Sequence, residues 1–231
     1  MNIKMLKVAV AGLALSVSGF ANAGLITNGD FETGDLTGWT IAGLGNSTCP
    51  TAPGDWNVSS TSSTGCTEVS NPISGSYAAY NMLDGANAME YRLSQIIDID
   101  TGFSAATLDW MHDAIWSTGT SVREFTIDIY DVTGVNLLAN LYSESYVGVG
   151  STNGWQSHSI DISSSLSLFQ GQSVSLAFAT HIPATWTGPA GFGLDAISLE
   201  VETADVPEPS TLAIFALGMI GLASRRFKRQ S

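Results

Sequence analysis

The three histidines are the side chains best suited to bind a transition metal or to activate a nucleophile. His112, His158 and His181 lie far apart in the sequence, and none stands beside another at a spacing typical of metal ligands or of a catalytic pair. The sequence also contains no G-x-S-x-G, P-loop or H-E-x-x-H motif. We therefore predict that the protein is not an enzyme. Because carboxylates are plentiful and no pair stands out, a carbohydrate-active hydrolase or lyase remains the alternative.

Tryptophans offer a different chemistry, because an exposed indole ring can stack on the apolar face of a sugar. Trp110 shares a strand face with Leu108, which indicates a core position, and Trp39 also reads as packing. Trp56, Trp116 and Trp186 lie in polar or Gly/Pro/Thr-rich surroundings. We predict these three as sugar-binding platforms, with burial as structural residues as the alternative for each.

Asp195 is a candidate metal ligand. It stands in phase with Ile197, Leu199 and Val201, so unless a bulge intervenes its carboxylate points toward the core. An unpaired charge there is costly and needs a neutralising partner. Calcium fits because it binds several carboxylate and carbonyl oxygens. Hydrogen bonds from loop amides are the alternative.

The two ends of the chain differ from its centre in charge. Lys4 and Lys7 precede an apolar run that stops at Ala21-Asn22-Ala23, which predicts a signal peptide over residues 1–23. Between Gly24 and Val206 only two basic residues face 20 acidic ones, a net charge of −18. Such a domain repels nucleic acid, so we predict no nucleic-acid partner. Export would place Cys49 and Cys66 in an oxidising compartment, where a disulfide is expected and two free thiols are the alternative.

The central residues 24–205 predict a single all-β domain. EFTIDIYD, VSLAFAT and YRLSQIIDID alternate between apolar and polar residues, and the last would place Gln95 on the inward face, where it needs a backbone partner. With no long helix to connect parallel strands, the fold expected is an antiparallel β-sandwich of the jelly-roll type. Further strands are expected near residues 25–32, 38–41, 76–81, 107–113, 137–142, 155–162 and 192–201.

LITNGDFETGDLTGW at residues 25–39 and GFGLDAISLEV at residues 191–201 resemble the opening and closing strands of galactose-binding-like jelly rolls, the fold of many carbohydrate-binding modules. In that family a structural calcium joins the first and last strands. The resemblance thus implies Glu32 and Asp195 as side-chain ligands, with Asn28, Asp30 or backbone carbonyls as weaker candidates.

Residues 206–231 combine Pro207-Glu208-Pro209, an apolar stretch from Leu212 to Ala223, and the basic pair Arg225-Arg226. This tripartite tail resembles the PEP-CTERM sorting signal of Gram-negative bacteria. The twelve apolar residues make about 18 Å of helix, short for a hydrocarbon core of about 30 Å. The resemblance implies a short transmembrane helix that holds the chain transiently at the inner membrane until an exosortase cuts near the Pro-Glu-Pro motif. A permanent tail anchor is the alternative.

We therefore expect an exported protein of the cell surface or extracellular matrix in a bacterium that makes exopolysaccharide and forms biofilm. A non-enzymatic protein that binds exopolysaccharide, or forms part of the matrix, is the first hypothesis. A purely structural surface protein without a ligand is a further alternative, since the Ser/Thr-rich stretch at residues 58–67 could carry glycans.

Overall fold

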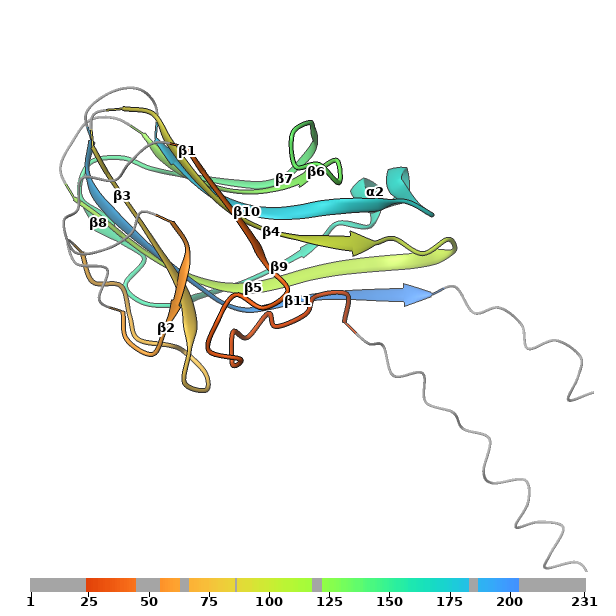
Figure 1. The fold of residues 1–231 in the computed structure, drawn as a ribbon, viewed down its shortest axis with the longest axis horizontal. Coiled ribbons are helices and arrows are strands. Elements are labelled where there is room, and N and C mark those ends of the chain that lie inside the picture. Colours follow the sequence, from red (N-terminus) through yellow and green to blue (C-terminus); the bar gives the residue numbers. More distant parts are fainter. Residues whose placement is uncertain are drawn as a thin grey trace, which may run out of the picture.

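Two antiparallel sheets pack face to face in the computed structural model, which describes residues 24–44, 55–62, 67–85, 87–117, 122–182 and 187–203 (Figure 1). The all-β sandwich expected from the sequence is confirmed. The predicted division into residues 1–23, 24–205 and 206–231 stays a prediction. Cys49, Cys66 and the stretch at residues 212–223, predicted as a transmembrane helix, lie outside the described residues.

Each sheet is built from strands that are distant in the sequence. Sheet A has the order β1-β4-β10-β6-β7, and sheet B has the order β2-β3-β11-β5-β8, with β9 also paired to β5. The strands of sheet A are β1 (Thr40–Leu44), β4 (Met89–Asp98), β10 (Ser173–Ile182), β6 (Arg123–Tyr130) and β7 (Leu137–Tyr146). Those of sheet B are β2 (Asn57–Ser59), β3 (Ala78–Gly85), β11 (Thr187–Thr203), β5 (Phe103–Trp116), β8 (Gly150–Ser151) and β9 (Gln156–Asp161).

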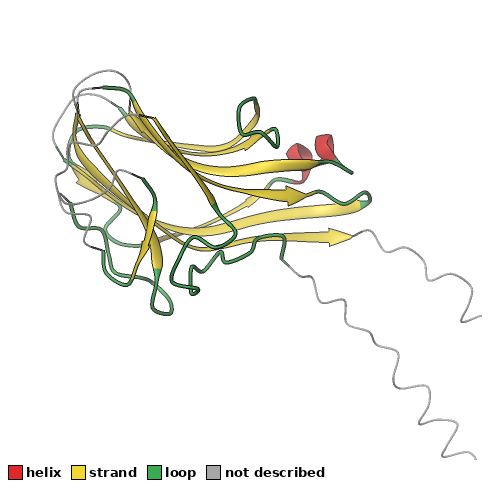
Figure 2. Ribbon diagram, in the orientation of Figure 1, coloured by secondary structure: helices red, strands yellow, loops and turns green. Residues whose placement is uncertain are grey.

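Helical structure in the described part of the chain is confined to one connection. The α-helix α2 (Ser163–Leu166) runs into a 3-10 turn, η1 (Ser167–Phe169), between β9 and β10 (Figure 2). Leu166 buries its side chain in the core there. A helix of four residues cannot cross over a sheet, which agrees with pairing that is antiparallel between every two neighbouring strands described.

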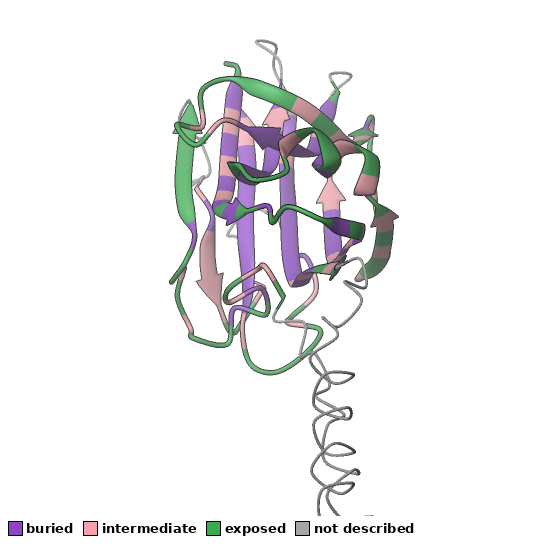
Figure 3. Ribbon diagram, turned by 90° about the vertical axis from the view of Figure 1, so that its right-hand side faces the viewer, coloured by how far each residue is buried: buried purple, intermediate pink, exposed green. Residues whose placement is uncertain are grey.

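Alternation along the strands sets the core. The inward residues Phe125, Ile127 and Ile129 of β6 are at most 1% exposed, and buried residues follow the strands of the sandwich while its connecting loops are largely exposed (Figure 3). Val174, Leu176 and Phe178 of β10 are buried in the same way. The period-two pattern therefore identified the core faces of the two central strands of sheet A correctly.

The strand expected near residues 25–32 is not formed. Asn28 and Phe31 adopt positive φ angles of 52° and 56°, which breaks an extended run. The segment still follows β11, because Leu25 N–H donates to the Leu199 carbonyl at 3.2 Å and Ile197 N–H donates to the Gly29 carbonyl at 2.9 Å. The turn drives Phe31 into the core, where it is fully buried.

Gln95 links this opening segment to sheet A. It is 7% exposed, its Oε1 accepts from Thr27 N–H at 2.8 Å, and its Nε2 donates to the Thr27 carbonyl at 2.9 Å. The side-chain amide of Gln95 thereby makes the two hydrogen bonds with Thr27 that the backbone of a neighbouring strand would make. This is the backbone partner expected for a buried Gln95.

Replacing Gln95 with leucine should lower the free energy of unfolding by about 2 kcal/mol, because Thr27 loses both hydrogen-bond partners. Urea unfolding monitored by tryptophan fluorescence measures the change. Gln172→Leu is the matched control, since Gln172 is exposed and its side chain makes only a 3.5 Å contact with the Leu168 carbonyl. Equal losses in the two variants would contradict this role for Gln95.

Candidate functional site

Trp116 lies in the wall of an open pocket of about 660 Å³ at the end of sheet B. Its ring is half-buried, lies 4.6 Å from the Tyr146 ring centre, and donates its indole N–H to the Val147 carbonyl at 3.3 Å. The polar residues that line the same pocket are Thr67, Ser117, Ser151 and Asn153. The pocket thus combines an aromatic ring with hydroxyl and amide groups, the combination that binds the apolar face and the hydroxyls of a sugar.

The other two predicted platforms do not join Trp116. Trp56 is 2% exposed and belongs to the hydrophobic core, with its indole N–H bonded to the Tyr91 carbonyl at 3.1 Å. This corrects the expectation for Trp56, because a ring covered by the core presents no face to a sugar. The polar residues next to Trp56 in the sequence suggested an exposed ring. Those neighbours do not line the ring, which packs in the core. Trp186 lies outside the described residues.

Asp195 and Glu32 approach the same loop, residues 73–77. Glu32 Oε1 accepts from the amides of Ser76 and Tyr77, both at 2.8 Å, and the carboxyl group fills the space where a Cβ on Gly75 would stand. Gly75 has a φ of +59°, so glycine permits both the turn and this close approach. Asp195 Oδ1 accepts from Ala196 N–H at 2.7 Å; the amides of Ile73 and Ser74 also favour the charged carboxylate, but none forms a hydrogen bond of regular geometry with the fully buried Oδ2.

A β-bulge in β11 places Asp195 on the opposite face from the one expected. The register with β5 shifts between Asp195 and Ser198, and Ala196 has a φ of 50°. Leu194, Ile197 and Leu199 therefore point into the core, whereas Asp195 does not share their face. It is nevertheless 0% exposed. The carboxylate is buried as expected, and the bulge, which the expectation had left open, takes it off the face of Ile197 and Leu199.

Burial sets the protonation of Asp195. Desolvation raises the pKa of Asp195 to about 6, and the nearby Glu32 carboxylate also raises it. The amides of Ala196, Ser74 and Ile73 lower this pKa, but their effect is smaller than that of desolvation. The pKa of Tyr80 is also raised, first by burial and then by the negative charges of Asp195 and Asp113. A cation beside Asp195 and Glu32 would relieve the repulsion between these carboxylates.

The structure brings together two histidines that the sequence keeps far apart. His112 of β5, His158 of β9 and Glu144 of β7 each offer a ligand atom, and these three atoms lie within 4.8 Å of one another. Register explains the meeting, because β9 pairs with β5 so that His158 stands opposite Trp110. Spacing along the sequence did not indicate this group, because its members lie on three different strands. His112 alternates in phase with Leu108 and Trp110, so the sequence already places it on the inner face of β5. That His158 lies beside it follows only from the pairing of β9 with β5.

Hydrogen bonds and burial control the charge of this cluster. Interaction with His112 holds the pKa of Glu144 at about 2, despite an opposing effect of burial. Burial lowers the pKa of His158, and the neighbouring His112 lowers it further. The pKa values of Tyr142 and Tyr146 are raised, mainly by burial and also by the Glu144 carboxylate. At neutral pH the cluster therefore holds a carboxylate, a neutral His158 and two phenols.

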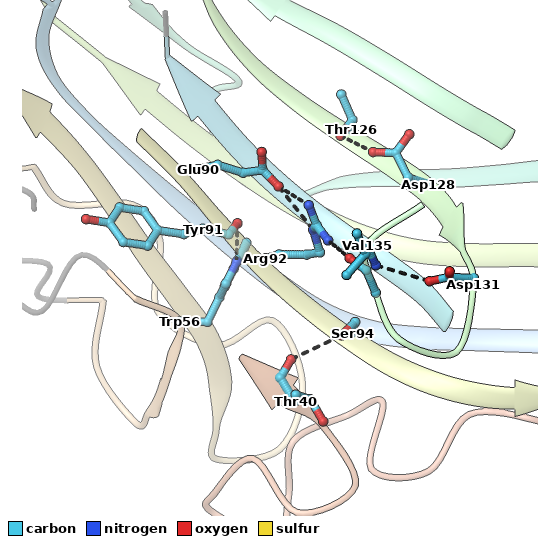
Figure 4. Close-up of polar contacts among 11 residues, drawn as sticks. Thr40, Trp56, Glu90, Tyr91, Arg92, Ser94, Thr126, Asp128, Asp131 and Val135 are labelled. Atoms are coloured by element: carbon cyan, nitrogen blue, oxygen red, sulfur yellow. Dashed lines mark hydrogen bonds and ion pairs between the residues drawn. The ribbon is translucent and has the colours of Figure 1, made fainter. Parts of the chain in front are cut away.

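A second polar network lies on sheet A (Figure 4). Arg92 forms an ion pair with Glu90, donates to the Gly134 carbonyl at 2.7 Å, and lies 3.9 Å from the centre of the Tyr130 ring. Asp131 accepts from Val135 N–H at 3.1 Å and so fixes the turn that brings Gly134 to Arg92. These groups satisfy one another, and the network acts as a brace for the turn at residues 131–136.

Comparison with known proteins identifies the tail. Residues 205–229 match the family model described as the PEP-CTERM protein-sorting motif. The chain carries this sorting motif. The motif indicates export and sorting to the cell surface in Gram-negative bacteria, and it implies processing by an exosortase. Pro207, Glu208, Pro209, Arg225 and Arg226 fall within the matched residues. Among the described residues, the structure contains no helix with the length and hydropathy of a membrane span.

Solved structures resemble the sorted domain in fold. TmCBM61 in complex with β-1,4-galactotriose has 17% sequence identity and a TM-score of 0.45, over 78% of this chain and 99% of that one. The CBM22-1 xylan-binding domain of Paenibacillus barcinonensis Xyn10C has 15% identity and a TM-score of 0.40, over 80% and 99%. The Stig cyclase Fisc from Fischerella sp. TAU has 15% identity and a TM-score of 0.46, over 78% and 97%.

These likenesses concern the fold alone. No curated protein matches the sequence.

Proposed function

We propose that the protein is an exosortase-sorted, non-enzymatic surface or matrix protein that binds exopolysaccharide through the Trp116 pocket. The observation that carries the proposal is the half-buried Trp116 ring in an open pocket beside Thr67, Ser117 and Asn153. The ring offers an apolar platform, and the polar side chains offer partners for hydroxyl groups. Export and sorting would bring this pocket to the cell surface, where it could meet exopolysaccharide.

The charge of the domain narrows the ligand class. With a net charge of −18 between Gly24 and Val206, the domain repels polyanions and favours neutral glycans. A chain with few charged substituents is therefore the preferred ligand. Binding to such a glycan should depend little on salt, because few ion pairs would form.

We further propose that a structural calcium ion joins the opening segment to β11 through Glu32 and Asp195. The unpartnered, buried Oδ2 of Asp195 supports this site, because calcium would supply the missing positive charge. Both amides that reach Glu32 donate to Oε1, which leaves Oε2 available. Asn28 is a weaker ligand candidate, since its Oδ1 already accepts from Thr33 N–H at 3.4 Å while its Nδ2 donates to the carbonyls of Asp35 and Thr37.

Replacing Trp116 with alanine should weaken glycan binding by roughly 30-fold, about 2 kcal/mol, because the stacking platform is removed. Retention of the purified protein on immobilised exopolysaccharide measures the loss. Trp116→Phe keeps a ring beside Tyr146 and should retain part of the affinity. Trp155→Ala is the matched control, because Trp155 is also half-buried and bonded to a carbonyl, that of Asn71, but does not line the pocket.

The same assay separates the alternatives. Specific retention of the wild type that only the Trp116 variants lose supports the binding function. Shortened sugar chains after incubation would indicate a hydrolase or lyase instead. No retention on any polysaccharide, in calcium or in chelator, would favour a purely structural surface protein.

A further inference from the structure

The open edge of the sandwich brings ligand groups from three strands together. Sheet A ends at β7, and the opposing edge of sheet B is formed where β9 pairs with β5. Glu144 projects from β7, His158 from β9 and His112 from β5, with ligand atoms within 4.8 Å of one another. His112 Nε2 lies 3.4 Å from Glu144 Oε2. Among the described residues, no other set of three or more histidine or acidic side chains meets at this distance.

Two ring nitrogens in this cluster are buried without a partner. His112 is 1% exposed and its Nδ1 makes no hydrogen bond, and His158 Nε2 is likewise buried and unbonded. Each imidazole carries one donor or acceptor nitrogen that a stable interior normally satisfies. A bound cation would satisfy the lone pair of His158 Nε2, which makes this unpartnered nitrogen a second indication of a ligand, independent of the convergence itself.

The surrounding aromatic residues hold the cluster in place. The Trp110 ring stacks on His158 with centres 4.8 Å apart, and His112 stacks between His158 at 4.6 Å and Phe125 at 5.2 Å. Tyr142 donates its hydroxyl to Glu144 Oε2 at 2.8 Å. Tyr146 bonds through its hydroxyl to His112 Nε2 at 2.9 Å, and a metal ion bound at that nitrogen would displace this hydroxyl. The ring stacking and the Tyr142 hydrogen bond are outer contacts of the kind that orient metal ligands and tune their affinity.

The geometry points to a transition-metal site, formed by His112, Glu144 and His158, that binds zinc or a similar first-row divalent ion. Two imidazoles and one carboxylate suit zinc, whereas calcium prefers a cage of oxygens. Zinc bonds of about 2.0 Å place tetrahedral ligands about 3.3 Å apart, close to the separation of His112 and Glu144.

Three protein ligands leave the fourth position of zinc to a water or to an oxygen of a bound molecule. Glu144 keeps 34% of its side chain exposed, so this position is reachable from the sandwich edge. The site is distinct from the Trp116 pocket and from the Glu32–Asp195 pair, since it shares no residue with either.

The test is binding of zinc and of cobalt, each alone, to the full chain in mild detergent after removal of metals with a chelator. Calorimetry should find one tightly bound zinc ion per chain, and cobalt should give the visible absorption of a tetrahedral site with nitrogen ligands. His158→Gln and Glu144→Gln should each weaken zinc binding about 100-fold, and Tyr142→Phe about 10-fold. If His112→Gln fails to fold, the His158 and Glu144 variants decide.

His181→Gln is the matched control, because His181 pairs with Glu124 elsewhere and should leave zinc binding unchanged. Calcium should not compete for the site, and Asp195→Asn should not alter zinc affinity. A wild type that binds no stoichiometric zinc would overturn the proposal. So would a His181 variant that loses as much affinity as the His158 variant.

Discussion

Replacing Gly29 with alanine should lower the free energy of unfolding by about 3 kcal/mol and the melting temperature by roughly 6–12 °C. A Cβ at this position would lie 2.0 Å from the Ile197 carbonyl oxygen and 3.0 Å from its carbonyl carbon. Both atoms are backbone, so no side-chain rotation relieves the clash. The opening segment must move away from β11, and the hydrogen bond from Ile197 N–H to the Gly29 carbonyl is lost with it.

Gly24→Ala is the matched control for this variant. Gly24 lies against the same strand, but a Cβ there would stand 3.8 Å from the Leu199 carbonyl oxygen, an ordinary contact. Thermal unfolding followed by circular dichroism should show a change below about 0.5 kcal/mol for Gly24→Ala. Equal melting temperatures for the Gly29 and Gly24 variants would disprove the close packing of the opening segment on β11.

Asp195 should make the metal-free protein less stable as the pH rises. Its pKa is about 6 when folded, above its ordinary value of 3.8, so the folded state holds the proton more tightly between these values. The stabilisation is complete below pH 4 and is lost as the pH rises through 6. The difference approaches about 3 kcal/mol, because the two pKa values differ by roughly two pH units. Urea unfolding in a chelator at pH 4 to 8 measures it.

Comparison with Asp195→Asn isolates this effect from that of other groups. The variant should lack the fall in stability between pH 4 and 7, and at pH 8 it should be more stable than the metal-free wild type. Added calcium should restore the wild type at pH 8, by about 2.7 kcal/mol at 100 times the dissociation constant, and leave the variant unchanged. A wild type that shows no response to calcium or to chelator would rule out the calcium site.

Asp131→Asn is a control in which the dependence of stability on pH should have the opposite sign. Hydrogen bonds from the side chains of Thr133 and Asn136 lower the pKa of Asp131. Asp131 therefore contributes stability above its ordinary pKa, and this contribution is lost as the pH falls. The wild type should exceed the Asp131 variant in stability at neutral pH, and the two should converge in acid. The opposite slopes of the Asp195 and Asp131 comparisons exclude a general effect of net charge.

The fold was predictable from the sequence where the apolar residues of a strand all lie on one face. In β6 and β10 the alternating residues were assigned to the correct face because burial decides which side chains lie inward. Residues 25–32 show where this reasoning stops. Their apolar residues suggested a strand, but Asn28 and Phe31 adopt positive φ, and no local propensity predicts that of a phenylalanine. The close packing of Gly29 on Ile197 is a tertiary contact that a window of residues does not contain.

The candidate sites were predictable only in part, because each depends on which strands become neighbours. Polar neighbours in the sequence suggested exposure for both Trp56 and Trp116, yet only Trp116 reaches a pocket. His112 and His158 lie 4.6 Å apart between ring centres, although neither strand reveals the other's register. One bulge at Ala196 was enough to move Asp195 to the other face of β11. Period-two patterns give the face of a side chain but not its partner.

The register of β11 on β5 also shows which end of the sandwich leads toward the sorting motif. Thr203 pairs with Phe103 at one end, and Ala190 pairs with Trp116 at the other. About 13 residues of strand separate these ends, a span of roughly 40 Å. The sorting motif at residues 205–229 therefore follows the end of β11 that is remote from Trp116. The pocket therefore lies near the end of the sandwich opposite to the end at which β11 leads toward the sorting motif.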